Sequence, residues 1–210
     1  MTTRIWNLCL LLALAAFATT AAAAERLTVA NPDPTMAPVK MMTPQNRDYL
    51  VVESFEGAFP PVGWTTMTSG EATPWVQTDD TANSGSYSAA VYWGDQGAWQ
   101  DEWLVSPAIS TAGLTTLILS FAEAQSDWAY YGYQHDIMIS STVPDDPAAF
   151  TSLLTMTPAD HPIGADWQQV SLNLDAWLVH PTLYVAFRYT GSWADTWYID
   201  DVLIYEPYAH

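Results

Sequence analysis

The segment from Thr196 to Tyr205 reads TWYIDDVLIY, and it decides the fold class. Apolar residues lie on both sides of two adjacent carboxylates, Asp200 and Asp201, and they alternate with a period of two, which is typical of a β-strand. We expect one face of the strand to carry Trp197, Ile199 and Leu203 and the other face Tyr198, Val202 and Ile204. Because both faces are apolar, we predict that this strand is covered on both sides.

The same period of two runs through the chain from residue 48 onward. It appears at residues 50–56, 87–93, 101–106, 116–123, 135–141, 170–174 and 183–187. Turn-forming clusters separate these segments, as at 81–85 and 143–147, and residues 145–150 predict a single helical turn. Short strands with frequent turns predict an all-β fold, an antiparallel β-sandwich with jelly-roll topology.

The first 24 residues have the features of a secretory signal peptide. Arg4 precedes an apolar run from Leu8 to Phe17, and three small residues end at Ala24. The run is shorter than the roughly 20 apolar residues of a membrane-spanning helix, so we expect no membrane insertion. We expect export to the periplasm or the extracellular space, with cleavage near Ala24. Cys9, the single cysteine, leaves with this segment, so the mature chain has no disulfide.

Residues 25–47 differ from the remainder in composition. They carry four prolines and no aromatic residue, and they hold three of the four basic residues that remain after cleavage. We interpret 25–47 as an extended, flexible leader and 48–210 as one folded domain.

The charge balance excludes two classes of partner. Among 210 residues there are 5 Lys and Arg against 23 Asp and Glu, a net charge of −18. Within 48–210 the only base is Arg188. Nucleic-acid binding and docking on anionic lipid both require clustered basic residues, so neither is expected.

The pair Asp200 and Asp201 points to a metal. Neighbouring side chains of a strand face opposite sides, so at least one of the two carboxylates should be buried. A buried carboxylate needs a cation or several hydrogen-bond donors, and one arginine cannot serve every acid. An all-oxygen site outside the cell favours Ca²⁺. The alternative is a set of solvated carboxylates at strand ends.

Six short segments, in order, resemble one known family. They are ESFEG at 53–57, FPPVGW at 59–64, SGSYS at 84–88, DEWLVSP at 101–107, VAFR at 185–188 and IDDV at 199–202. Over 48–206 the chain is similar to the choice-of-anchor J, or cleaved-adhesin, domains of secreted bacterial proteins. The resemblance implies a jelly roll related to MAM domains and to carbohydrate-binding modules, with a structural Ca²⁺ joining the first strand to the last.

The resemblance also implies which residues hold the metal. The ligands would be Glu56, Asp101, Asp200 and Asp201, with Glu53 as a further candidate. Asp101 and Glu102 could instead cap an exposed strand start, and Arg188 is expected to pair with one of these acids. Family members commonly continue into a sorting signal or further domains, whereas this chain ends at His210, so we expect free secretion.

Aromatic residues suggest a second kind of site. Ten tryptophans lie in 48–210, and Trp64, Trp75, Trp103, Trp167 and Trp197 are expected mostly in the core. Residues in loops or at strand ends could form a binding patch for an extracellular glycan or protein. These are Trp128, Tyr130, Tyr131, Tyr133, Trp93, Trp99 and Trp193.

Catalysis has little support in the sequence. The motifs of serine hydrolases, zinc proteases and phosphate-binding loops are absent, and the four histidines are scattered. We therefore expect a secreted, non-catalytic, calcium-stabilised adhesion or recognition domain. The alternatives are a carbohydrate-binding module and, third, a polysaccharide-active enzyme that uses two of the many carboxylates.

Overall fold

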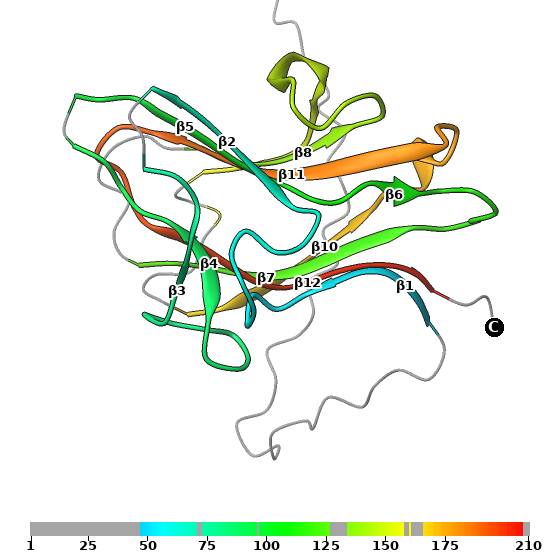
Figure 1. Cartoon of the computed structure of the whole chain (residues 1–210), viewed down its shortest axis with the longest axis horizontal. Helices are drawn as coiled ribbons and strands as arrows, with labels where there is room; N and C mark the ends of the chain where they lie inside the picture. Colours follow the sequence, from blue (N-terminus) through cyan, green and yellow to red (C-terminus); the bar gives the residue numbers. More distant parts are fainter. Residues whose placement is uncertain are drawn as a thin grey trace, which may run out of the picture. The chain divides into compact units, whose positions relative to one another are not determined.

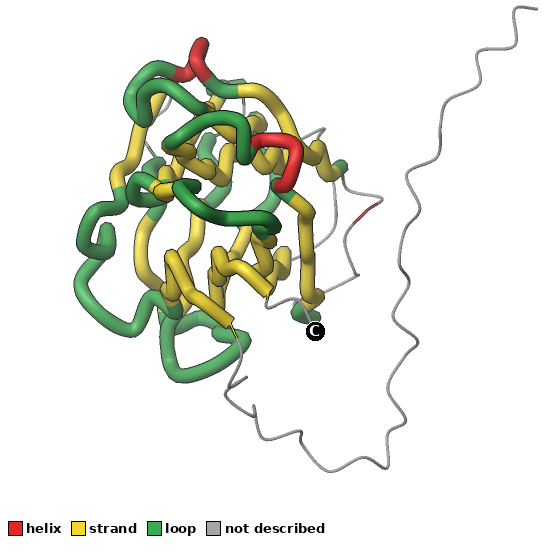
Figure 2. The backbone as a smooth tube through the Cα atoms, turned by 90° about the vertical axis from the view of Figure 1, so that its right-hand side faces the viewer, coloured by secondary structure: helices red, strands yellow, loops and turns green. Residues whose placement is uncertain are grey.

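The computed structural model describes residues 47–70, 73–95, 97–126, 134–157, 160 and 166–207. The predicted signal peptide and leader lie outside these residues, except Arg47, which opens the first strand. Figure 2 shows that the described chain consists of strands and loops, with short helical turns at η1 (Pro147–Ala149) and η3 (Asp175–Trp177). None of the helices in this part of the chain has the length and hydrophobicity needed to cross a membrane.

The strands form two antiparallel sheets (Figure 1). Sheet A contains, in order, β10 (Gln168–Asn173), β7 (Ile118–Gln125), β12 (Trp197–Pro207), β4 (Ser88–Val91) and β3 (Val76–Thr78), and β1 (Arg47–Glu53) pairs with β12. Sheet B contains, in order, β2 (Thr65–Gly70), β5 (Gln100–Val105), β11 (Thr182–Gly191), β8 (Gln134–Ser140) and β9 (Thr151–Met156), and β6 (Ile109–Ser110) pairs with β11. The predicted all-β, antiparallel sandwich is confirmed.

The core lies between the two sheets and is rich in aromatic rings. Phe187, at the centre of β11, is fully buried. Its ring makes an edge-to-face contact with the ring of Phe121 in the opposite sheet, with 5.0 Å between the ring centres. The ring of Trp64 stacks on it with 6.4 Å between the centres. Since the chain has a single cysteine and therefore no internal disulfide, these contacts between the sheets are a main source of its stability.

A bulge in β12 changes which of its residues face the core. Between Asp200 and Leu203 three steps along β12 match two steps along β7, and Asp201 adopts a left-handed φ of 48°. An extra residue reverses the alternation of faces. Val202 and Ile204 therefore join the core together with Trp197 and Ile199, whereas Leu203 does not. The prediction that Leu203 shares a face with Trp197 was wrong for this reason.

Candidate functional site

The bulge in β12 coincides with a change of neighbouring strand. On one side β12 pairs with β7 along most of its length. On the other side it pairs first with β4, through Trp197 to Ile199, and then with β1, from Val202 onward. Asp200 and Asp201 lie between these two pairings. Their carboxylates are therefore beside the end of β1 and the loop 79–87, which connects β3 to β4.

Asp200 is completely buried and is satisfied by backbone donors. Its Oδ2 accepts hydrogen bonds from the N–H groups of Asn83 at 2.9 Å and Ser84 at 3.1 Å, and its Oδ1 accepts one from Asp201 N at 2.7 Å. Burial raises the pKa of Asp200 to about 6, and the negative charge of Asp201 adds to this, while the three N–H donors lower the pKa.

Asp201 holds the same loop through side chains. Its Oδ2 accepts a hydrogen bond from Asn83 Nδ2 at 2.6 Å, and its Oδ1 accepts one from Ser84 Oγ at 2.7 Å. The two aspartates together bind the backbone and side chains of two successive loop residues. These hydrogen bonds hold loop 79–87 against β12 at the point where the pairing of β12 changes from β4 to β1.

Glu56 and Glu53 approach this place from the end of β1. Glu56 Oε1 accepts hydrogen bonds from the N–H groups of Ser86 and Tyr87, both at 2.8 Å. Gly85, with a φ of 67°, leaves room for this carboxylate, because a Cβ there would collide with Glu56 Oε1. Glu53 lies opposite Val202, and its Oε1 accepts a hydrogen bond from Phe55 N at 2.6 Å. We call Glu53, Glu56, Asp200 and Asp201 the acid edge.

The chemistry of the acid edge suits Ca²⁺, although its hydrogen bonds also satisfy it without a metal. Ca²⁺ takes carboxylate, amide, hydroxyl and backbone carbonyl oxygens, and loop 79–87 with the four acids supplies all of these. Within the described residues the Oε2 atoms of Glu53 and Glu56 accept no hydrogen bond, whereas both oxygens of each aspartate do. In the same part of the chain no three Asp, Glu, His or Cys side chains form a group that could hold a metal. The burial of Asp200 therefore does not by itself require a cation.

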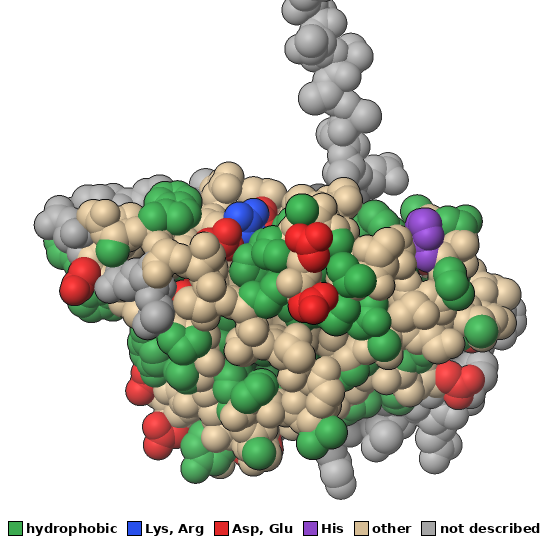
Figure 3. All heavy atoms as spheres, turned by 45° about the horizontal axis from the view of Figure 1, so that its top comes forward, with side chains coloured by type: hydrophobic (Ala, Val, Ile, Leu, Met, Phe, Trp, Pro, Cys, Tyr) green, Lys and Arg blue, Asp and Glu red, His purple; other side chains and the backbone are tan. Residues whose placement is uncertain are grey.

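Asp101, the remaining predicted ligand, lies in the other sheet. Its two carboxylate oxygens accept hydrogen bonds from Arg188 Nε at 2.7 Å and Arg188 Nη2 at 2.8 Å, and the guanidinium lies 4.8 Å from the centre of the Trp103 ring. In Figure 3 the blue basic atoms on this face lie beside red acidic atoms. The structure therefore does not bring Asp101 to the acid edge, and it confirms that Arg188 pairs with one of these acids.

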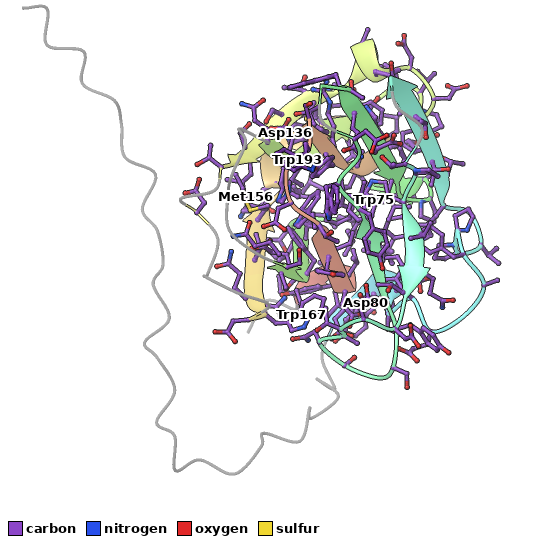
Figure 4. The ribbon with its side chains drawn as sticks, turned by 90° about the vertical axis from the view of Figure 1, so that its left-hand side faces the viewer. Trp75, Asp80, Asp136, Met156, Trp167 and Trp193 are labelled. Carbon is purple, nitrogen blue, oxygen red and sulfur yellow. The ribbon has the colours of Figure 1, made fainter. Side chains whose placement is uncertain are left out.

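A second candidate site lies at one end of the sandwich. We call the loops formed by residues 92–95 with 97–99 and by residues 192–196 the loop end. Trp93 and Trp99 expose 50% and 57% of their surface. Trp193, labelled in Figure 4, is half-buried and has a left-handed φ of 49°. Trp128, Tyr130, Tyr131 and Tyr133 lie outside the described residues.

The tryptophans expected in the core are mostly there. Trp64, Trp75, Trp103 and Trp197 are buried. Trp167 is only half-buried and donates its indole N–H to Thr81 Oγ1 at 3.1 Å. Figure 4 shows Trp167 near Asp80, at some distance from Trp193 in this view.

Sequence reasoning missed a group of polar residues buried beneath the loop end. Gln100, Glu102 and His135 have no exposed surface, and the imidazole of His135 stacks on Trp197 at 4.3 Å. Within the described residues, Glu102 Oε2 accepts no hydrogen bond. Burial raises the pKa of Glu102 to about 7, although hydrogen bonds from Thr68 and Thr73 lower it. The alternative that Glu102 caps an exposed strand start was therefore wrong. Period-two alternation cannot show which face of a strand meets the other sheet.

Comparisons with known proteins agree with this architecture. No family model matches the sequence, and no curated protein matches it. Among solved structures, the K3 cleaved adhesin domain of Lys-gingipain from Porphyromonas gingivalis has a TM-score of 0.60 and 23% identity, over 76% of this chain and 98% of that domain. The K1 cleaved adhesin domain of the same protein has a TM-score of 0.55 and 24% identity, over 73% and 96%.

A carbohydrate-binding module also shares the fold. TmCBM61, solved in complex with β-1,4-galactotriose, has a TM-score of 0.52 and 15% identity, over 73% of this chain and 94% of the module. At these identities the likeness concerns the fold alone. The chain is therefore a jelly-roll sandwich similar in structure to cleaved adhesin domains and to a carbohydrate-binding module.

Proposed function

We propose that this protein is an exported, non-catalytic domain for adhesion or recognition, stabilised by Ca²⁺ at the acid edge. The observation that carries the proposal is the loop end, where Trp93 and Trp99 leave half or more of their surface exposed. Large aromatic side chains are enriched where proteins contact their partners, because they bury much area with few rotatable bonds. The nearby sandwich provides a rigid support.

A structural use of the singled-out acids supports the non-catalytic part of the proposal. Asp200 and Asp201 bind loop 79–87, and Asp101 binds Arg188. Each of these carboxylates thus stabilises a contact between distant segments. A polysaccharide-active enzyme would shorten its polymer, so a reducing-end assay on soluble polysaccharides tests the third interpretation directly.

Calcium is proposed from the position of the acid edge. Glu53, Glu56, Asp200 and Asp201 would hold the ion together with oxygen atoms of loop 79–87, after moving closer together than they lie in the structure, where no three of the described acids form a metal-binding group. Bound Ca²⁺ would supply positive charge where the first and last strands of the domain meet, in a region with a large excess of acids. It would thereby offset the repulsion among these carboxylates.

Thermal melting in Ca²⁺ and in chelator tests the metal proposal. A ligand that binds only the folded state adds about 2.7 kcal/mol at 100 times its Kd. For a domain of this size that corresponds to a rise of roughly 5–11 °C in Tm. Asp201→Asn should reduce the rise, whereas Asp145→Asn, in an exposed turn away from the acid edge, should leave it unchanged. Equal melting curves in Ca²⁺ and in chelator would refute the proposed metal site.

The exposed tryptophans also favour a second candidate function, carbohydrate binding. Flat indole faces stack on the apolar faces of pyranose rings. Because the domain is strongly acidic, a neutral glycan is a better partner than an anionic one. The expected result is quenching of tryptophan fluorescence by a neutral polysaccharide, weakened by Trp93→Ala and by Trp99→Ala.

The glycan titration should be run in Ca²⁺ and in chelator. Trp177→Ala, which removes a half-buried tryptophan of η3, is the matched control and should not change the affinity. Trp128→Ala tests the predicted patch outside the described residues. No response across a broad panel of glycans would leave a protein partner as the target of the loop end.

A further inference from the structure

The side chain of Gln100 contacts the backbone on both sides of Trp93. Gln100 opens β5 and is completely buried. Its Oε1 accepts a hydrogen bond from Gly94 N at 2.6 Å, and its Nε2 donates to the carbonyl oxygen of Tyr92 at 2.9 Å and also to the hydroxyl of Thr73. One buried amide therefore binds both peptide groups of Trp93, as a neighbouring β-strand would.

Trp99 is held at the other end of the same loop. Gly70, opposite Gln100 in the pairing of β2 with β5, has a left-handed φ of 85°. A Cβ at Gly70 would collide with the carbonyl oxygen of Trp99, so glycine is required for this close approach. The backbone of Trp99, the residue directly before Gln100, thus packs closely against Gly70 at the end of β2.

The tip of the loop between β4 and β5 is also held, by a hydrogen bond to the loop between β11 and β12. Ala98 N donates to Asp95 O at 3.2 Å and closes a turn. Gly97 N donates to Ser192 Oγ at 3.2 Å, and Ser192 directly precedes Trp193. The backbones that carry Trp93, Trp99 and Trp193 are therefore connected through hydrogen bonds and one steric contact.

We propose that Gln100 is a positioning residue, which fixes the backbone of Trp93 so that Trp93 and Trp99 form a preorganised surface for the flat face of a sugar ring. This inference rests on the proposed contact function of the loop end. A surface that is ordered before binding avoids the loss of conformational entropy that a mobile loop would suffer on binding. The buried amide of Gln100 keeps the backbone of Trp93 ordered, and the exposed indoles of Trp93 and Trp99 contact the sugar.

The amide group of Gln100 is specifically suited to this role. One donor and one acceptor on the same side chain match the carbonyl of Tyr92 and the N–H of Gly94. Methionine fills a similar volume but offers neither. Asparagine keeps the amide on a side chain that is one methylene shorter and cannot reach both peptide groups from the same backbone position. The two variants Gln100→Met and Gln100→Asn therefore separate hydrogen bonding from packing.

The test uses full-length protein labelled with 5-fluorotryptophan and observed by ¹⁹F NMR, with the Trp93 line assigned from Trp93→Phe. In both Gln100 variants we expect the Trp93 line to shift or broaden more than that of Trp177. Glycan affinity should fall about three- to tenfold, the range expected when one loop must be ordered on binding. The matched control is Gln169→Met on β10, whose amide bonds Ser120 Oγ alone among the described residues, and it should change neither quantity.

The possible results separate the positioning role from the binding function. An unchanged Trp93 line in folded Gln100→Asn overturns the inference, even if Gln100→Met fails to fold. A merely structural role would lower Tm without singling out the Trp93 line. If the Trp93 line moves but no glycan binds the wild-type protein, the positioning of Trp93 holds and the carbohydrate function fails.

Discussion

Replacing Glu102 by glutamine should stabilise the protein at neutral and alkaline pH. Glu102 is completely buried on β5, and its Oε2 accepts no hydrogen bond from the part of the chain that the structure describes. Arg188, the one Lys or Arg in residues 48–210, binds Asp101 instead. The charged form of Glu102 is therefore poorly compensated, whereas a glutamine keeps an oxygen for the N–H of Thr73 without a charge.

The size and sign of the effect follow from the pKa of Glu102. Burial raises this pKa to about 7 from 4.5. Between these two values the folded protein binds more protons than the unfolded chain, so the free energy of unfolding falls as the pH rises. At about 1.4 kcal/mol per pKa unit, the loss reaches about 3 kcal/mol above pH 7. Glu102→Gln should match the wild type near pH 4.5 and exceed it by about 3 kcal/mol at pH 8.

Urea unfolding of both proteins between pH 4.5 and pH 8 measures this difference. The matched control is Glu206→Gln, because Glu206 is exposed to solvent at its carboxylate and the N–H of Thr115 lowers its pKa. That variant should lose stability above the ordinary pKa of glutamate, with the opposite sign. A Glu102→Gln protein that is equally or less stable than the wild type at pH 8 would refute the reasoning.

Three further predictions concern the core and the acid edge. Phe187→Ala should lower the free energy of unfolding by about 3–5 kcal/mol in urea, because it opens a cavity between the sheets; a loss below 1 kcal/mol would contradict the packing. Gly85→Ala should destabilise the protein by about 1–2 kcal/mol and reduce its response to Ca²⁺, since the new Cβ meets Glu56; an unchanged melting curve would contradict this contact. The rise of Tm in Ca²⁺ should shrink as the pH falls through about 6, because a metal needs the ionised form of Asp200; a rise independent of pH would place the ion elsewhere.

Strands with strong alternation could be found from the sequence, and weakly marked ones could not. Eight predicted segments correspond to β1, β4, β5, β7, β8, β10, β11 and β12, and η1 lies inside the predicted helical turn. The strands β2, β3, β6 and β9 were missed. β3 and β6 are very short, and β2 is an edge strand of Thr, Ser, Met and Gly whose residues are mostly exposed. Edge positions need no apolar face, so they leave little signal in the sequence.

Some residues of the candidate sites could likewise be predicted from the sequence, and others could not. Asp200 and Asp201 were predicted from their position in an apolar strand, and the structure places them against loop 79–87, which Glu56 also contacts, while Glu53 lies on β1 opposite Val202. Asp101 could not be separated from these acids by sequence, because its place depends on the sheet to which β5 belongs. Gln100 was missed because nothing in its local sequence shows that its amide meets the backbone of Trp93.

The sequence by itself determined the fold class, the acidic surface and the acid pair in the last strand. These properties depend on composition and on alternation within single segments, which act over a few residues. Tertiary structure alone decided that Asp201 forms a bulge, that Asp101 binds Arg188 and that Glu102 is buried. Each of these depends on which strands become neighbours and which face meets the other sheet, and segments far apart in the chain determine both.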